Sequence, residues 1–170
     1  IMNETHEPDT FYGVERNTVE KNIIPATWWE AGAMVTKELK PGLTADIAWT
    51  SGLKGTDAKS YKIRDGRQKV AEADATSFAG IGRLKYTAIP GLELAASLYV
   101  QPDCCQEDAA GCGSAKMIET HAVYKKDKFQ VRALYARWDI HGSAVAAKGA
   151  DQQDGYYIEP AYRFNDKWGA

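Results

Sequence analysis

The sequence predicts an all-β chain that folds as an antiparallel, up-and-down transmembrane β-barrel. Apolar and polar residues alternate with a period of two over seven segments, which indicates strands with one face buried or lipid-facing. Short turns and long polar connections follow one another in strict alternation, which is typical of a barrel with its short turns at one end. Aromatic residues gather near both ends of the segments, as they do at the two interfaces of a bilayer.

The composition allows one folded domain. The chain has 170 residues, of which 44% are hydrophobic and 11% aromatic. Its 21 basic and 23 acidic residues nearly cancel, which argues against a protein dedicated to nucleic-acid binding. No stretch approaches the roughly 18 consecutive apolar residues of a membrane-spanning helix. The absence of such a stretch does not exclude a β-barrel, because apolar and polar residues alternate along barrel strands. We expect residues 1–170 to be part of a single barrel domain.

Residues 1–26 are predicted to be a loop, because they are too polar for a lipid-facing strand, and successive hairpins are expected over 27–170. The first hairpin begins at Trp29, turns at 40–42 through proline and glycine, and returns over 43–50.

Five further strands repeat the pattern: 78–89, 92–100, 114–125, 129–139 and 156–164. The last of them contains Pro160, which removes a hydrogen-bond donor and weakens an isolated strand. A further short turn is expected at 165–167. The long connections cover about 52–76, 102–113 and 141–154.

The aromatic residues form two predicted belts. Beside the short turns lie Tyr86, Tyr124, Phe129, Phe164 and Trp168. Nearest the long connections lie Trp28, Trp29, Trp49, Tyr99, Trp138, Tyr156 and Tyr157. Two such belts around small and aliphatic residues favour a barrel. The alternative is that these aromatic residues pack the core of a soluble β-sandwich.

Charged residues in a barrel are expected on the lumen face, because a charge facing lipid costs several kcal/mol at mid-depth. Alternation assigns these residues to the lumen: Glu30, Asp46, Arg83, Lys85, Glu93, Glu119, His121, Lys125, Arg132, Glu159 and Arg163. Four of them form a candidate basic ladder that binds and passes anions: Arg83, Lys85, Arg132 and Arg163. The alternative is that these cations pair across strands with Glu93, Glu119 and Glu159.

The long connection at 54–76 carries candidate constriction residues: Lys59, Lys62, Arg64 and Arg67. If this loop folds inward, it narrows the channel and sets its charge. If it points outward, it is a solvated external loop. Residues 68–73 are predicted to make a short helical turn.

The three cysteines are disulfide candidates: Cys104, Cys105 and Cys112. Thiols clustered on a polar loop fit an oxidising compartment, with one bridge to Cys112 and one thiol left over. A zinc site is disfavoured, because His121 lies nine residues further on, inside a predicted strand. We therefore expect no metal and no other cofactor.

Enzyme motifs are missing from the sequence, which has no GxSxG, HExxH or phosphate-binding GxxxxGK[ST]. Ser97 and His121 are a conceivable hydrolase pair, but one serine near one histidine is common by chance. We expect that the chain is not an enzyme.

Two phrases of the sequence carry a family resemblance. Residues 3–17, NETHEPDTFYGVERN, continue through 23–32, IIPATWWEAG, and residues 155–164 read GYYIEPAYRF. Together they resemble the phosphate-selective porin O and P family. The resemblance implies a sixteen-stranded, homotrimeric barrel in the outer membrane of a Gram-negative bacterium, of which this chain is a central portion of about seven strands. It also implies contact with lipid and lipopolysaccharide and passage of small anionic solutes, phosphate-type anions among them.

We therefore expect a passive channel for small hydrophilic solutes that favours anions. The competing class is a secreted or periplasmic β-sandwich that binds carbohydrate through tryptophans: Trp28, Trp29, Trp49 and Trp138. A sandwich closes its apolar face against a second sheet, whereas a barrel exposes that face continuously.

Overall fold

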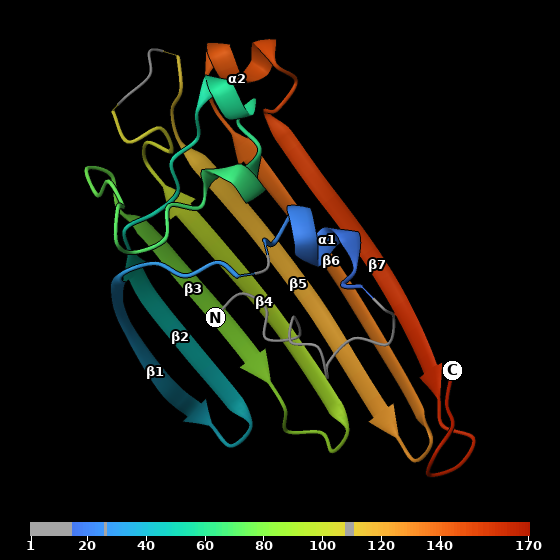
Figure 1. The fold of residues 1–170 in the computed structure, drawn as a ribbon. Coiled ribbons are helices and arrows are strands. Elements are labelled where there is room, and N and C mark those ends of the chain that lie inside the picture. Colours follow the sequence, from blue (N-terminus) through green and yellow to red (C-terminus); the bar gives the residue numbers. More distant parts are fainter. Residues whose placement is uncertain (1–14, 26, 108–110) are drawn as a thin grey trace.

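The computed structural model describes residues 15–25, 27–107 and 111–170. Seven antiparallel strands form one sheet in which each strand pairs with its neighbours in sequence (Figure 1). The strands are β1 (Gly32–Lys40), β2 (Leu43–Thr50), β3 (Ala79–Tyr86), β4 (Leu92–Gln101), β5 (Ala115–Lys126), β6 (Phe129–Ile140) and β7 (Gln152–Tyr162). The predicted all-β class and up-and-down order are confirmed. The described sheet is open, with β1 and β7 at its edges.

The last strand begins four residues earlier than predicted, at Gln152, because 152–155 pair with 136–139 of β6. Pro160 fits within this strand for a geometric reason. The N–H of Arg163 donates to Lys128 on the β6 side, whereas the N–H of Tyr162 points the other way and donates to Ala170. Successive N–H groups of a strand alternate in direction, so the nitrogen of Pro160 faces away from β6, where no ladder donor is lost.

Helices interrupt the predicted loops. The described part of the 1–26 loop contains α1 (Thr18–Asn22), which corrects that prediction; residues 1–14 and 26 lie outside the described residues. The side chain of Asn17 caps α1 by accepting a hydrogen bond from the Val19 N–H at 3.0 Å. A second short helix, α2 (Ser143–Ala147), lies between β6 and β7.

The helical turn predicted at 68–73 is wrong. The connection between β2 and β3 instead forms two 3₁₀ helices upstream, η2 (Asp57–Lys59) and η3 (Ile63–Gly66). Lys69 adopts a left-handed backbone conformation with φ of 59°, which is incompatible with a right-handed helix. The Gln68 amide closes this stretch by accepting from the Asp74 N–H and donating to its carbonyl oxygen.

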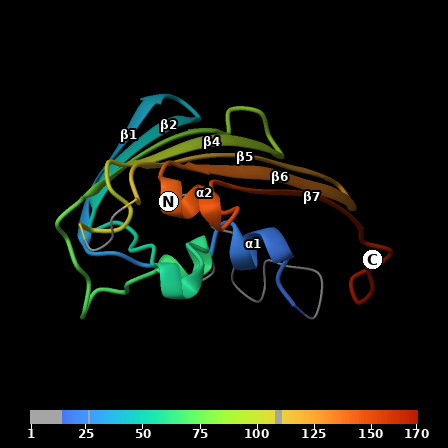
Figure 2. The same ribbon diagram turned by 90° about the horizontal axis from the view of Figure 1, so that it is seen from above.

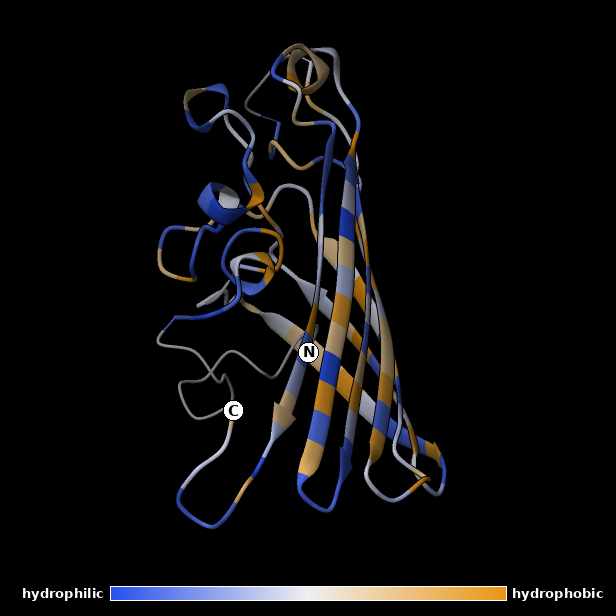
Figure 3. Cartoon of the chain, turned by 90° about the vertical axis from the view of Figure 1, so that its right-hand side faces the viewer, coloured by the Kyte–Doolittle hydropathy of each residue, from blue (hydrophilic) through white to orange (hydrophobic). Residues whose placement is uncertain are grey.

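The sheet is curved, and the described helices and long connections gather on its concave side (Figure 2). The side view shows the same arrangement, with covering segments on one side of the sheet only (Figure 3). The main core lies between the concave face and the connections. Its larger members are Leu53, Tyr61, Ile63, Tyr99, Met117, Trp138 and Ile140. A second cluster lies beneath α1 and consists of Val19, Ile24, Leu134, Ala136 and Tyr157.

Candidate functional site

The register of the strands sorts side chains into rows that run across the sheet. One convex row reads Leu43, Tyr86, Leu94, Ala122, Ala133 and Ile158. The next reads Ala45, Leu84, Ala96, Thr120, Tyr135 and Tyr156. Across β2 to β7 neither row contains a charge, whereas on β1 the same rows continue to Lys40, opposite Leu43, and Lys37, opposite Ala45. Most of the large side chains in these rows are exposed; for example, Ile158 is 68% and Leu84 52% exposed, whereas Leu43 and Tyr86 are half-buried.

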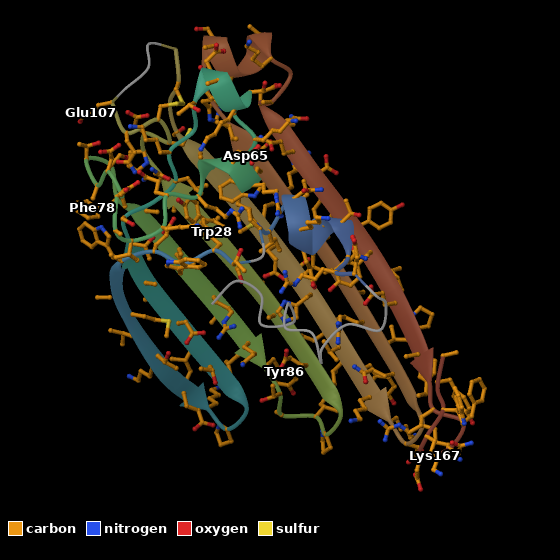
Figure 4. The ribbon with its side chains drawn as sticks, viewed as in Figure 1. Trp28, Asp65, Phe78, Tyr86, Glu107 and Lys167 are labelled. Carbon is orange, nitrogen blue, oxygen red and sulfur yellow. A yellow bond between two sulfur atoms is a disulfide. The ribbon has the colours of Figure 1, made fainter. Side chains whose placement is uncertain are left out.

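The convex apolar belt, which we define as these two rows, ends abruptly toward the long connections. One row beyond Tyr135 and Tyr156, Arg137 stands opposite Asp154, and the row after that pairs Lys116 with Asp139. At the other end of the sheet lie the short turns with Tyr86 and Lys167, whereas Asp65, Phe78 and Glu107 lie at the end of the long connections (Figure 4).

The concave face carries the charged residues. One row reads Asp46, Arg83, Ser97, Glu119, Ala136 and Gly155, and the next reads Thr44, Lys85, Ala95, His121, Leu134 and Tyr157. Together with Glu93, Arg132 and Glu159 these rows form the concave charged wall. The strand alternation thus places every charge of the wall opposite to the apolar belt.

Arg83 is paired within this wall. Its Nε donates to Asp46 Oδ2 at 2.7 Å, and Thr36 donates to Asp46 Oδ1 at 2.6 Å. Both members of the Arg83–Asp46 pair are buried, and their charges offset each other. The predicted cross-strand partners of the basic residues were Glu93, Glu119 and Glu159. Asp46 was therefore not predicted as the partner of Arg83, although it was assigned to the same lumen face.

His121 lies between two carboxylates. Its Nδ1 is 2.6 Å from Glu119 Oε1, and its Nε2 is 3.4 Å from Glu93 Oε1. The second oxygen of Glu119 and the hydroxyl of Ser97 are buried with no hydrogen-bond partner among the described residues. Because both ring nitrogens of His121 face carboxylates, the arrangement does not make Ser97 a nucleophile activated by that ring.

The other three members of the candidate basic ladder are spread over the sheet. Lys85 shares the concave face of β3 with Arg83. Arg132 lies on β6, where its Nη1 is 3.8 Å from Glu159 Oε2, one of the pairs that the cross-strand alternative predicted. Arg163 follows β7 and is exposed at the end with the short turns. The structure therefore brings together Arg83 and Lys85, but not all four residues.

The connection with the candidate constriction residues lies over the concave face. Tyr61 and Ile63 are buried in the main core, and Gln153 of β7 hydrogen-bonds the backbone of both residues. These contacts hold the connection against the concave face, which agrees with the inward-folded arrangement of 54–76 and not with a loop that points outward.

The candidate constriction residues themselves are largely tied to backbone atoms. Arg64 donates to the carbonyl of Lys21 at 2.5 Å, and Arg67 donates to the carbonyl of Arg64 at 2.6 Å. Lys59 donates to the carbonyl of Asp65 at 2.9 Å, and Lys62 is exposed. Partial burial and the neighbouring charge of Arg64 lower the pKa of Arg67.

The segment with α1 is fastened to the concave face. Trp138 Nε1 donates to the carbonyl of Ile23 at 2.8 Å, and the Tyr157 hydroxyl donates to Glu20. A Cβ on Gly155 would lie 2.9 Å from Val19, so the absence of a side chain there admits the helix. This helix was not predicted from the sequence, although Asn17 followed three residues later by Glu20 is a helix-start signal.

The four tryptophans of the carbohydrate alternative do not share a surface. Trp138 is fully buried against Tyr99, with ring centroids 5.0 Å apart, and Trp28 packs on both rings. Trp49 instead stands edge-on to Phe78 at 5.7 Å, and Trp29 lies beneath the Lys69 ammonium.

The cysteines form a compact group between β4 and β5. A disulfide joins Cys105 and Cys112, and Cys104 remains a buried thiol. Burial raises the pKa of Cys104 to about 11, and the charge of Asp103 adds to this effect. Among the described residues, these three sulfurs are the one group of three potential metal ligands, and they lie within 4.8 Å of one another. Two of them are bonded to each other, so the disulfide form offers a metal only one thiol.

No helix in the described part of the chain is long and apolar enough to cross a membrane. No protein-family profile matches the chain, and no solved structure matches it. The chain is similar to an uncharacterized protein of Aquifex aeolicus (strain VF5), with 29% identity over 157 residues. The match covers 90% of this chain and 33% of that protein, so the chain spans about a third of the length of the relative.

Proposed function

We propose that this chain is a section of the wall of an outer-membrane porin, a passive aqueous channel for small hydrophilic solutes that favours anions. The observation that carries the proposal is the contrast between the convex apolar belt and the concave charged wall. In this proposal the belt faces lipid and the wall faces the lumen, in a homotrimer that also contacts lipopolysaccharide.

The convex belt supports contact with lipid. A soluble protein rarely exposes a large continuous apolar patch, because such a surface binds other molecules or aggregates. The two rows cross six strands without a charge and end at paired tyrosines, Tyr135 and Tyr156. Strands of nine to eleven residues suffice to cross a bilayer when tilted. β5 and β6, with 12 residues each, are long enough.

The open edges support a larger sheet. β1 and β7 each pair with one neighbour within the described sheet, which leaves backbone donors and acceptors on their outer sides. Such groups are costly in lipid, and closure of the sheet into a barrel removes them. A barrel of sixteen strands, of which these are seven, requires a longer chain, and the Aquifex relative is about three times as long as the matched region.

The preference for anions is assigned to the folded-in connection and to β3. Arg83 and Arg132 have carboxylate partners in Asp46 and Glu159, which reduces the net charge of the wall. The connection adds Lys59, Lys62 and Arg64 on the concave side, with Lys85 on the neighbouring strand. A cluster of cations that exceeds its acidic partners raises the local concentration of small anions, phosphate-type anions included.

The test is single-channel conductance of the full-length protein that contains this chain, in a planar bilayer with a salt gradient and added phosphate. Stepwise conductance with a reversal potential that favours anions is the expected result. Lys62→Gln and Arg83→Ala should reduce that preference, whereas the matched control Lys116→Gln, on the convex face beyond the belt, should not. Conductance steps without ion preference would support the channel but overturn the proposed preference for anions. A soluble monomer without steps would overturn the barrel in favour of the sandwich.

A further inference from the structure

The three cysteines are held together by backbone contacts between two long connections. The carbonyl of Cys104 accepts from the Gly55 N–H at 2.7 Å, and the N–H of Cys104 donates to Gly113 at 2.9 Å. Asp103 fixes the following turn by accepting from the N–H groups of Cys105 and Glu107, both at 2.8 Å. The connection that carries Glu107 is visible at the end of the sheet with the long loops (Figure 4).

The free thiol lies directly against the disulfide. Cys104 Sγ is 3.3 Å from Cys112 Sγ, the sulfur that is bonded to Cys105. Cys104 is 4% exposed and Cys105 is fully buried, so dissolved thiols have little access to either sulfur. Cys104 is therefore the nucleophile best placed to reach this disulfide.

We propose that this cluster is a site of intramolecular thiol–disulfide exchange, in which Cys104 and Cys105 alternate as the partner of Cys112. The Cys104 thiol loses its proton, and the thiolate attacks Cys112 Sγ. The bond between Cys104 and Cys112 forms as the bond between Cys112 and Cys105 breaks. Cys105 leaves as a thiolate and takes up a proton. One disulfide and one thiol are present before and after, so the step needs no oxidant or reductant.

The two arrangements enclose loops of almost equal length. Cys105 and Cys112 are seven positions apart, and Cys104 and Cys112 are eight positions apart. Loop-closure entropy depends only weakly on length, so it hardly distinguishes the two disulfides. Cys104 and Cys105 both belong to the main core, with exposed fractions of 4% and 0%, so burial hardly distinguishes the two disulfides either.

The approach of Cys104 to the disulfide is oblique. In-line attack on a disulfide bond of about 2.05 Å would place the two outer sulfurs about 5.3 Å apart, given the 3.3 Å contact. The three sulfurs lie within 4.8 Å of one another. Exchange therefore requires the Cys104 side chain to rotate, which predicts a slow reaction in the folded protein.

Burial and the neighbouring charge of Asp103 also slow exchange at neutral pH, because both raise the pKa of Cys104. The other titratable groups that face this thiol are Tyr99 on β4, and Tyr61 and Lys62 on the connection between β2 and β3. With a pKa of about 11, roughly one Cys104 thiol in ten thousand is a thiolate at pH 7. The exchange rate should rise about tenfold for each pH unit up to that pKa.

Serine variants of the intact protein test whether Cys104 reaches Cys112. Each variant is reduced, refolded, oxidised in air and mapped by mass spectrometry of unreduced peptides. C104S should form the disulfide between Cys105 and Cys112, and C105S should form the one between Cys104 and Cys112 at a rate within about tenfold of the first. C112S is the matched control and should keep two thiols. If C105S keeps two thiols, or forms only disulfide-linked dimers, the proposal is wrong.

The wild-type protein provides a second test that does not depend on the folding of a variant. After incubation at pH 7 or pH 10, the protein is quenched in acid, unfolded and alkylated under acidic conditions with N-ethylmaleimide. The proposal expects the label on Cys104 at pH 7, and on both Cys104 and Cys105 after incubation at pH 10. A label confined to Cys104 at pH 10 would contradict exchange, as long as the reduced protein takes up label at all three cysteines.

Discussion

The convex and concave faces of this sheet are built by the same strands, yet they meet different surroundings. Across β2 to β7, the two convex rows expose most of their large side chains and carry no charge, whereas on β1 they continue to Lys40 and Lys37. On the concave face, Arg83 pairs with Asp46 and His121 contacts Glu119, and both arrangements are buried. A sheet that carries its buried charges on one face, and across β2 to β7 leaves a charge-free apolar belt uncovered on the other, is what the proposed barrel wall requires.

A charge placed in the convex belt is expected to have the largest effect. In the proposed barrel, Leu94→Arg should destabilise the protein by about 2–4 kcal/mol in lipid, because arginine at mid-depth would be poorly solvated. Urea unfolding of the full-length protein in lipid vesicles measures this difference. Lys116→Arg, on the same face beyond the belt, is the control and should change stability by less than about 0.5 kcal/mol. A Leu94→Arg protein as stable as the control would show that the belt faces water.

A larger side chain on the concave face beneath α1 is expected to have the next largest effect. Gly155→Val should cost about 1–3 kcal/mol, because the added side chain overlaps Val19 and forces α1 away from β7. Trypsin cleavage after Lys21 should become faster, since the helix loses its anchor. The control is Gly80→Ala, whose Cβ would meet no atom within 4 Å. Unchanged cleavage in Gly155→Val would mean that α1 does not depend on this contact.

Removing a carboxylate from the concave wall should have a smaller effect. Asp46→Ala deprives Arg83 and Thr36 of an acceptor, and we expect a loss of about 1–2 kcal/mol in the free energy of unfolding. Asp154→Ala, at an exposed position of the convex face, serves as the control. Equal stability of the two variants would mean that water replaces the lost acceptor fully.

The smallest effect is expected from the titration of the buried Cys104 thiol, which lies at the end of the concave face that the long connections cover. The pKa of Cys104 is raised to about 11 in the folded protein, against 9.0 for an ordinary thiol. The folded state therefore keeps its proton at a pH where the unfolded state has lost it, so stability falls as pH rises from about 9 toward 11. At pH 10 this should cost about 1 kcal/mol relative to pH 8.

Thermal unfolding at pH 8 and pH 10 measures this loss, and Cys104→Ser should remove it. The wild type and the variant share all other titrating groups, so their difference isolates Cys104. An identical pH dependence in both proteins would show that the thiol is not protected by burial.

Local patterns predicted much of the fold, and the failures have physical causes. Period-two alternation and turn residues located all seven strands, because both depend on neighbours close in sequence. The helical turn at 68–73 was wrong, because Gln68 binds the backbone of Asp74 and Lys69 adopts a left-handed conformation. The helix α1 was missed, because five residues form a stable helix only through tertiary contacts, here with Trp138 and Tyr157.

The sequence by itself determined the strands, their order and the separation of charged from apolar residues, since a period of two places alternate side chains on opposite faces. Only the tertiary structure decided that Arg83 pairs with Asp46, 37 positions away, and that Gln153 anchors the connection at Tyr61, 92 positions away. It also decided that Cys105, rather than Cys104, bonds to Cys112. These choices depend on strand register and on loop packing, which bring together residues whose local sequences carry no information about each other.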